Sequence, residues 1–229
     1  MVQEVIPIKL ALPYRTGSVN CYLVKTDTGF ILVDTGSSNK CMELESKLKQ
    51  FGCNSGNLHL IILTHGDFDH TGNAAYIRKN FNTKIAMHAE DSQIVERGNM
   101  FLNREKGNFF QNWIVKTLFG FGKSKRFIPD LYITNEFDLT EYGFNAEVIH
   151  IPGHSKGSIG ILTDDAKLFC GDLISNSDES DEPTINPIMD DLETANRSID
   201  ILKNLKVDIV YPGHGKPFTM NSFLTRLNN

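Results

Sequence analysis

The sequence has no excess of positive charge, few cysteines and no long apolar run. Its 23 Lys and Arg residues are outnumbered by 28 Asp and Glu residues, which gives a net charge of -5. The composition therefore offers no electrostatic reason to expect nucleic acid as a partner. The four cysteines lie far apart and show no CxxC spacing, so we expect reduced thiols rather than a disulfide framework.

Two further absences concern export and membranes. The start, Met1-Val2-Gln3-Glu4, lacks the positive charge and the apolar stretch of a signal peptide. No apolar run approaches the roughly 18 residues that a transmembrane helix needs. We therefore expect a cytoplasmic protein without a membrane partner. Its 229 residues are enough for one domain with its own core, so we expect a single domain over residues 1–229.

The most informative segment is Thr64-His65-Gly66-Asp67-Phe68-Asp69-His70, which directly follows an apolar run at residues 60–63. A short apolar run that ends in a polar cluster is typical of a buried strand whose end opens into a loop. Two imidazoles and two carboxylates in such a loop indicate a dinuclear metal site.

Three later segments repeat the same pattern, in which an apolar strand is followed by a small residue and a side chain that can bind metal. They are Ile151-Pro152-Gly153-His154, Leu168-Phe169-Cys170-Gly171-Asp172 and Ile209-Val210-Tyr211-Pro212-Gly213-His214. A glycine beside each such side chain lets the backbone turn sharply and approach a metal closely.

The remaining pattern is that of strands and helices in alternation. We expect strands at residues 19–24, 30–33, 60–63, 84–87, 146–151, 158–162, 167–169 and 209–211. We expect helices at residues 74–81 and 221–227, and two more whose apolar faces hold Cys41, Leu44, Leu48 and Phe51 in one and Leu192, Ala195, Ile199, Leu202 and Leu205 in the other. Asp190 and Glu193 fit a capping box at the start of the latter helix. Each half runs strands first and helix after, which favours two sheets between helices.

Residues 91–129 depart from this alternation. Aromatic residues are concentrated there, and those from Phe110 to Phe121 lie at helical spacing, which predicts a helical insertion. Three interpretations stay open for it. The insertion packs into the core, covers the metals as an apolar lid, or joins two copies of the chain in a homodimer.

Taken together, these segments resemble the metallo-β-lactamase superfamily of metallohydrolases. Its pattern is a Thr-His-x-His-x-Asp-His loop, a Gly-His loop, a Gly-Asp and a late Gly-His. The match runs from Asp34 to His214, nearly the whole chain. The resemblance implies an α/β fold, the αββα four-layer sandwich, with the metals at one edge of the paired sheets. Asp34-Thr35-Gly36 is similar to the family's strand-end aspartate, which supports the site from outside the ligand set.

The resemblance also implies the roles of seven side chains. The first of two divalent metal ions would be bound by His65, Asp67 and His154, the second by Asp69, His70 and His214, with Asp172 bridging them. Zinc is the first expectation for both ions. Asp69 would be the catalytic residue, because it can orient metal-bound hydroxide or pass a proton to the leaving group. The implied function is hydrolysis of an ester, lactone, thioester or related bond in a small-molecule substrate, one with an apolar portion if the insertion is a lid.

Asp67 is the one departure from the pattern, since the family usually has histidine there. An added oxygen ligand shifts the preference from zinc toward manganese or iron. The flavodiiron branch of the superfamily likewise has an acidic residue at this position. A di-iron enzyme of redox or oxygen chemistry, flavodiiron-like or dioxygenase-like, is therefore the alternative, followed by a non-catalytic metal-binding member. The segment from His154 to Ser158 resembles the hydrolases' Gly-His-Thr-Pro-Gly-Ser loop and favours the hydrolase.

Overall fold

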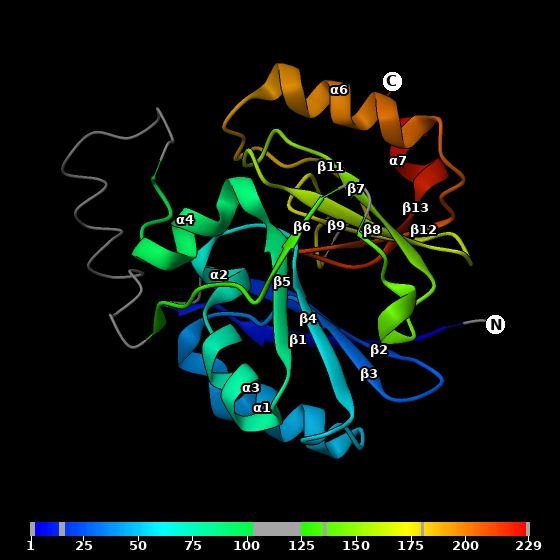
Figure 1. Cartoon of the computed structure of the whole chain (residues 1–229). Helices are drawn as coiled ribbons and strands as arrows, with labels where there is room; N and C mark the ends of the chain where they lie inside the picture. The colour runs from blue at the N-terminus through cyan, green and yellow to red at the C-terminus, as the bar shows by residue number, and fades with distance from the viewer. Residues whose placement is uncertain (1–2, 14–16, 103–124, 135–136, 180, 228–229) are drawn as a thin grey trace.

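The computed structural model describes residues 3–13, 17–102, 125–134, 137–179 and 181–227. Two sheets lie face to face, and helices cover the outer face of each (Figure 1). This arrangement agrees with the expected two sheets between helices.

The first sheet has six strands in the order β1-β2-β3-β4-β5-β6. Their bounds are β1 Glu4–Ala11, β2 Ser18–Lys25, β3 Phe30–Val33, β4 Leu58–Leu63, β5 Lys84–His88 and β6 Leu131–Ile133. The first three strands pair antiparallel, and the pairs from β3 to β6 are parallel. The helices of this half are α1 Cys41–Gln50, α2 Phe68–Thr71, α3 Ala74–Phe81 and α4 Ala89–Arg97, with a short 3-10 turn, η2, at Ser38–Lys40.

The second sheet has five strands in the order β13-β12-β9-β8-β7. Their bounds are β7 Ala146–His150, β8 Ile159–Thr163, β9 Lys167–Gly171, β12 Ile209–Pro212 and β13 Phe218–Thr219. A separate two-stranded ribbon joins β10 Ile174–Ser175 to β11 Thr184–Ile185. The helices are α6 Leu192–Lys203 and α7 Met220–Leu227, and a second 3-10 turn, η4, spans Thr140–Tyr142.

Three apolar clusters define the layers. One joins α1 and α3 to the outer face of the first sheet, through residues such as Leu44, Leu48 and Ile77. The middle cluster lies between the sheets, where Ile31 and Leu60 meet Ile161. The third packs the inner faces of α6 and α7 on the second sheet. Since strand side chains alternate between faces, each sheet supplies two of these three interfaces.

Several local predictions were wrong at the ends of helices. The N-cap of α6 is Asp191, not Asp190, because the Asp191 side chain accepts a hydrogen bond from the Thr194 N–H. Leu192, expected on the inner face, is 57% exposed at the first residue of that helix. Phe51 lies just past the end of α1 and is 43% exposed, so it does not share the buried face of Leu44 and Leu48.

The sequence patterns also missed some strands and left one prediction open. β1 was not predicted; it contains Pro7, which is tolerated there because β1 is an edge strand. The aromatic stretch from Phe110 to Phe121 lies outside the described residues, so the helical insertion at 91–129 stays a prediction there. The first residues of the predicted insertion belong to α4, which starts at Ala89 and packs beside β5.

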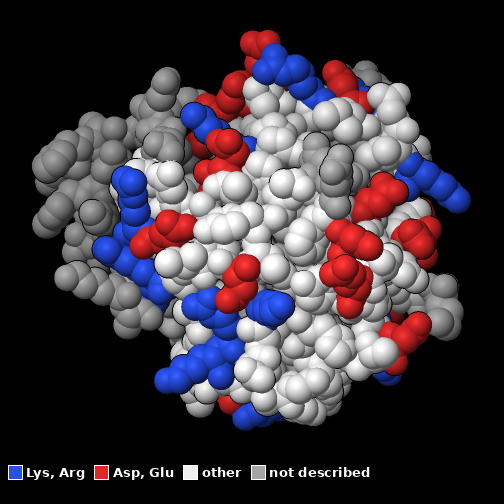
Figure 2. Space-filling view, in the orientation of Figure 1, with Lys and Arg blue, Asp and Glu red and all other residues white. Residues whose placement is uncertain are grey.

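Within the described residues, no helix combines the length and the apolar character needed to cross a membrane. On the face shown in Figure 2, small groups of basic and acidic side chains are separated by neutral surface. The described residues of that face therefore form no continuous basic surface.

Candidate metal centre

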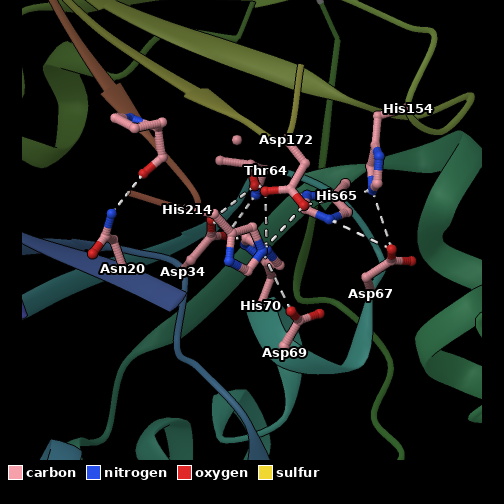
Figure 3. Close-up of polar contacts among 12 residues, drawn as sticks. Asn20, Asp34, Thr64, His65, Asp67, Asp69, His70, His154, Asp172 and His214 are labelled. Carbon is pink, nitrogen blue, oxygen red and sulfur yellow. Dashed lines mark hydrogen bonds and ion pairs between the residues drawn. The ribbon is translucent and has the colours of Figure 1, made fainter. Parts of the chain in front are cut away.

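The four glycine-containing segments meet at one edge of the paired sheets (Figure 3). The segment after β4 brings in the residues from His65 to His70, and its last residues form the short helix α2. The segments after β7, β9 and β12 bring in His154, Asp172 and His214. All seven side chains expected at the site thus lie together, although they come from both sheets.

The side chains form two groups that could each hold a metal ion. His65, His154 and Asp172 make one group, and Asp69, His70 and His214 make the other, with the ligand atoms of each group within 4.8 Å of one another. Asp172 also reaches the second group, since its Oδ1 lies 3.3 Å from His70 Nε2 and its Oδ2 3.3 Å from His214 Nε2. Its position between the groups is the one that a bridging carboxylate requires.

Asp67 lies beside the first group. Its Oδ2 is 3.1 Å from His154 Nε2 and 3.8 Å from His65 Nε2. A carboxylate oxygen therefore lies beside both imidazoles of the first group. On the other side, Asp69 Oδ2 lies 3.5 Å from His214 Nε2.

Each of the four imidazoles is oriented by a contact at its Nδ1 atom. The acceptors are Thr64 Oγ1 at 3.0 Å for His65, Asp34 Oδ2 at 2.8 Å for His70, the Ile188 carbonyl at 2.7 Å for His154 and the Ser18 carbonyl at 2.7 Å for His214. A hydrogen at Nδ1 leaves the lone pair on Nε2, which is the atom that a metal would take. All four Nε2 atoms contact the carboxylates at the centre.

Asp34 is the residue around which the first loop is built. It directly follows β3 in a left-handed conformation, with φ of 60°, and is buried. Its carboxylate accepts hydrogen bonds from the Thr64 N–H at 2.9 Å and the Thr64 hydroxyl at 2.8 Å, besides its contact with His70. These contacts agree with the supporting role that the resemblance implied.

The chemistry of the site fits divalent cations. His65 Nε2 is buried and has no hydrogen-bond partner among the described residues. Burial, together with the imidazoles of His70 and His154, holds the pKa of His65 well below its ordinary value, so this ring is neutral and can bind metal. Burial also lowers the pKa of His70, but the carboxylates of Asp172 and Asp34 outweigh it and raise that pKa well above its ordinary value. The site therefore attracts positive charge, which metal ions would supply in place of protons.

A cavity of about 730 Å³ opens onto the two groups. Its lining includes the site residues Asp67, Asp69, His154, Asp172 and His214, the polar residues Ser175, Asn176, Asn186 and Asp190, and the apolar residues Leu12, Phe68, Met100, Phe101, Pro187, Ile188 and Met189. No lysine or arginine is among the described residues of this lining. Besides the five site residues, Phe68 stands inside the motif itself, and Met100 and Phe101 lie in the 91–129 segment for which a lid was one interpretation. Sequence patterns gave the other lining residues no place at the site.

Three further histidines lie outside the two groups. His88 and His150 stack on each other with ring centroids 4.3 Å apart, and His59 contacts Thr28 at 3.1 Å. Cys170 is buried in the core beneath α6.

Comparisons with known proteins agree with this geometry. The family model of the metallo-beta-lactamase superfamily matches residues 14–214. The chain is 28% identical to the hydroxyacylglutathione hydrolase GloC of Haemophilus influenzae over 71% of this chain and 70% of the relative. It is 26% identical to the human acyl-coenzyme A thioesterase MBLAC2 over 90% of this chain and 76% of the relative.

Among solved structures, the crystal structure of TTHA1623 in a di-iron-bound form has the same fold. The TM-score is 0.71 at 24% identity, with 95% of this chain and 96% of the other covered. The expected αββα fold is therefore confirmed. The family match spans most of the sequence and the relatives are hydrolases, so this chain is a hydrolase that belongs to the metallo-β-lactamase superfamily.

Proposed function

We propose that this hydrolase uses two divalent metal ions to cleave an ester, lactone or thioester bond. The observation that carries the proposal is the pair of ligand groups joined by Asp172, into which four oriented Nε2 atoms point. His65, Asp67 and His154 would hold one ion, and Asp69, His70 and His214 the other, with Asp172 between them. When bound, the two ions supply a lowered water pKa and an acceptor for the negative charge that develops on the substrate's carbonyl oxygen.

Asp69 is the residue proposed to move a proton. Its side chain lines the cavity and stands 3.5 Å from His214. A carboxylate there can orient the attacking water through Oδ1 or Oδ2 and pass a proton to the leaving group. Asp34 and Thr64 do not reach the cavity, and their part is to hold His70 and His65 in position.

The cavity supports a substrate with an uncharged, apolar acyl portion. The cavity wall includes the apolar side chains of Phe68, Ile188 and Met189. Ile188 also contacts the centre directly, because its carbonyl accepts a hydrogen bond from His154 Nδ1. An apolar acyl chain placed against these side chains would lie next to the carbon that is attacked. Two relatives act on hydroxyacylglutathione and on acyl-coenzyme A, which makes acyl thioesters the first compounds to try.

Ile188→Ser tests the substrate assignment. The Ile188 side chain is 70% exposed, so the change removes apolar surface without opening the core. We expect KM for octanoyl thioesters to rise about tenfold while KM for acetyl thioesters changes little, since about 1.4 kcal/mol of lost contact is a factor of ten. Ile201→Ser, at a residue of α6 that is 46% exposed and outside the cavity, is the matched control. An equal change for both acyl lengths would contradict the assignment.

Metal content separates hydrolysis from the di-iron alternative, which the position of Asp67 beside His154 and His65 favours. Metals would be counted by mass spectrometry on protein purified without added metal and without oxygen. Two zinc or manganese ions per chain, with thioester turnover and no electron donor, supports the proposal. Two irons with turnover only in the presence of an electron donor would replace it by redox chemistry.

A further inference from the structure

We propose that Asp91 is a positioning residue that fixes the two loops of the first ligand group, and so controls how tightly that half of the centre holds its metal. The inference rests on the proposed dinuclear function and concerns a residue outside the seven ligands. Asp91 lies in the first turn of α4 and is 1% exposed.

The carboxylate of Asp91 joins two loops that are distant in the sequence. Its Oδ2 accepts hydrogen bonds from the Gly66 N–H at 2.8 Å and from the Ser155 hydroxyl at 2.7 Å. Its Oδ1 accepts from the Gly157 N–H at 2.9 Å. Gly66 stands between His65 and Asp67, and Ser155 follows His154, so the two donors to Oδ2 are each next to a residue of the first group, while Gly157 lies farther along the His154 loop.

The packing around these bonds leaves little freedom to the loops. A Cβ atom at Gly157 would lie 2.7 Å from the backbone nitrogen of Asp91, and one at Gly66 would lie 2.9 Å from the Ile94 side chain. Both glycines therefore allow the loops to rest directly on α4. Ser158 extends the network, because its Oγ accepts from the Ser155 N–H at 3.0 Å and lies 2.8 Å from Ser155 Oγ.

The second group is held by other contacts. Asp34 orients His70, and the Thr35 hydroxyl donates to the His70 carbonyl at 2.8 Å. The loop of His214 is held by β2, where the Asn20 side chain donates to the carbonyls of Pro212 and Gly215. Since none of these contacts passes through Asp91, its loss should affect the two halves of the centre unequally.

Asp91→Asn tests this, because asparagine has the shape of aspartate but presents an NH₂ group to donors that need an acceptor. Two binding steps would be resolved by titrating metal-free protein with Co²⁺, followed by visible absorbance and by competition with a chelator. We expect the wild type to bind two ions and Asp91→Asn to lose about 10- to 100-fold in affinity at one step only. Glu90→Gln removes the same charge from the neighbouring exposed residue of α4 and should leave both steps unchanged.

A second variant guards against a general loss of folding. Ser155→Ala removes one of the three donors to Asp91, and should weaken the same step by a smaller factor while circular dichroism of the metal-free protein stays unchanged. The inference is overturned if these variants weaken both steps equally, or neither, while the wild type binds two ions. If the wild type itself does not bind two ions, the proposed function fails, and the inference falls with it.

Discussion

At the residue scale, the geometry of the centre depends on the contact made by the Nδ1 atom of each imidazole, because that contact orients the ring. Asp34 shows how much one residue outside the ligand set decides, since its two oxygens hold both Thr64 and His70. Thr64 in turn gives its hydroxyl proton to Asp34, so its oxygen is left to accept from His65 Nδ1. One carboxylate thus orients two ligand residues of different groups.

Asp67→His should shift the metal preference of the centre toward zinc. The change replaces an oxygen atom 3.1 Å from His154 Nε2 by a nitrogen and removes one negative charge. We expect the ratio of bound zinc to bound manganese to rise about tenfold, which corresponds to about 1.4 kcal/mol. The measurement is metal content after reconstitution in an equimolar mixture of the two ions.

Asp27→His makes the same exchange in an exposed turn, and should leave that ratio as it is in the wild type. A ratio that does not move in Asp67→His would show that the carboxylate does not set the metal preference.

His88→Asn should remove a contribution to the stability of the metal-free protein that grows as the pH rises. Burial, and then the charge of His150, lower the pKa of His88, although Asp91 and Glu90 oppose the shift. A histidine with a lowered pKa stabilises the fold fully above its unfolded pKa of about 6.5, and this contribution is lost as the pH falls below that value. The raised pKa of His70 gives both proteins an opposing slope, so the prediction concerns the difference between them: the unfolding free energy of the wild type should gain on that of the variant as the pH rises from 5 to 7.

Asparagine is chosen because it keeps a side-chain acceptor at the start of α4, where His88 Nδ1 accepts from the Glu90 N–H. Urea unfolding at several pH values, with a chelator present throughout, gives the two slopes. Equal slopes would mean that His88 does not contribute to the pH dependence.

At the scale of elements, the packing of the helices on the sheets determines the positions of the strand ends. α1 packs on the first sheet through Leu44 and Leu48, both fully buried. The loops that carry the ligands begin where β4, β7, β9 and β12 end. A helix that shifts on the sheet would therefore also move the strand ends and the ligand side chains that follow them.

Leu48→Ala should destabilise the protein by about 2–5 kcal/mol, the range for a large apolar side chain removed from a packed core. Met42→Ala on the same helix, where the side chain is 66% exposed, should cost less than about 0.5 kcal/mol. Chemical denaturation of both variants gives the comparison. A cost for Leu48→Ala no greater than that of Met42→Ala would show that α1 is not anchored through this face.

At the scale of the whole molecule, the centre joins the two sheets. His65 and His70 come from the first half, and His154, Asp172 and His214 from the second. Because metal ions would bind the folded protein alone, their binding adds to its stability. At a free concentration one hundred times Kd, each site should add about 2.7 kcal/mol.

Thermal unfolding during a metal titration measures this effect, and the melting temperature should rise with the metal concentration. Asp172→Ala removes the carboxylate between the groups and should reduce the rise. A melting temperature independent of metal in the wild type would contradict a centre that joins the halves.

The sequence alone predicted what depends on neighbours along the chain. β3 and α3 were predicted with their observed bounds, because alternation and helical spacing are local properties of the residues. Residue types and neighbouring glycines pointed to the candidate segments, and the resemblance to the family implied which seven side chains make up the centre. Asp190 was wrongly chosen as a cap for the same reason, since a neighbouring aspartate fits the same local pattern.

Only the tertiary structure decided which distant residues support and surround the centre. Asn20 lies 192 positions from Pro212, and Asp91 lies 64 positions from Ser155, so no spacing in the sequence could pair them. The apolar side of the cavity at Ile188 is likewise formed by a loop in which no sequence pattern indicated a place near the centre. The sequence determined the kind of fold and the chemistry of the ligands, because these follow from residue type and local pattern. The supporting contacts and the cavity came from the packing of one sheet on the other, which places residues together regardless of their separation along the chain.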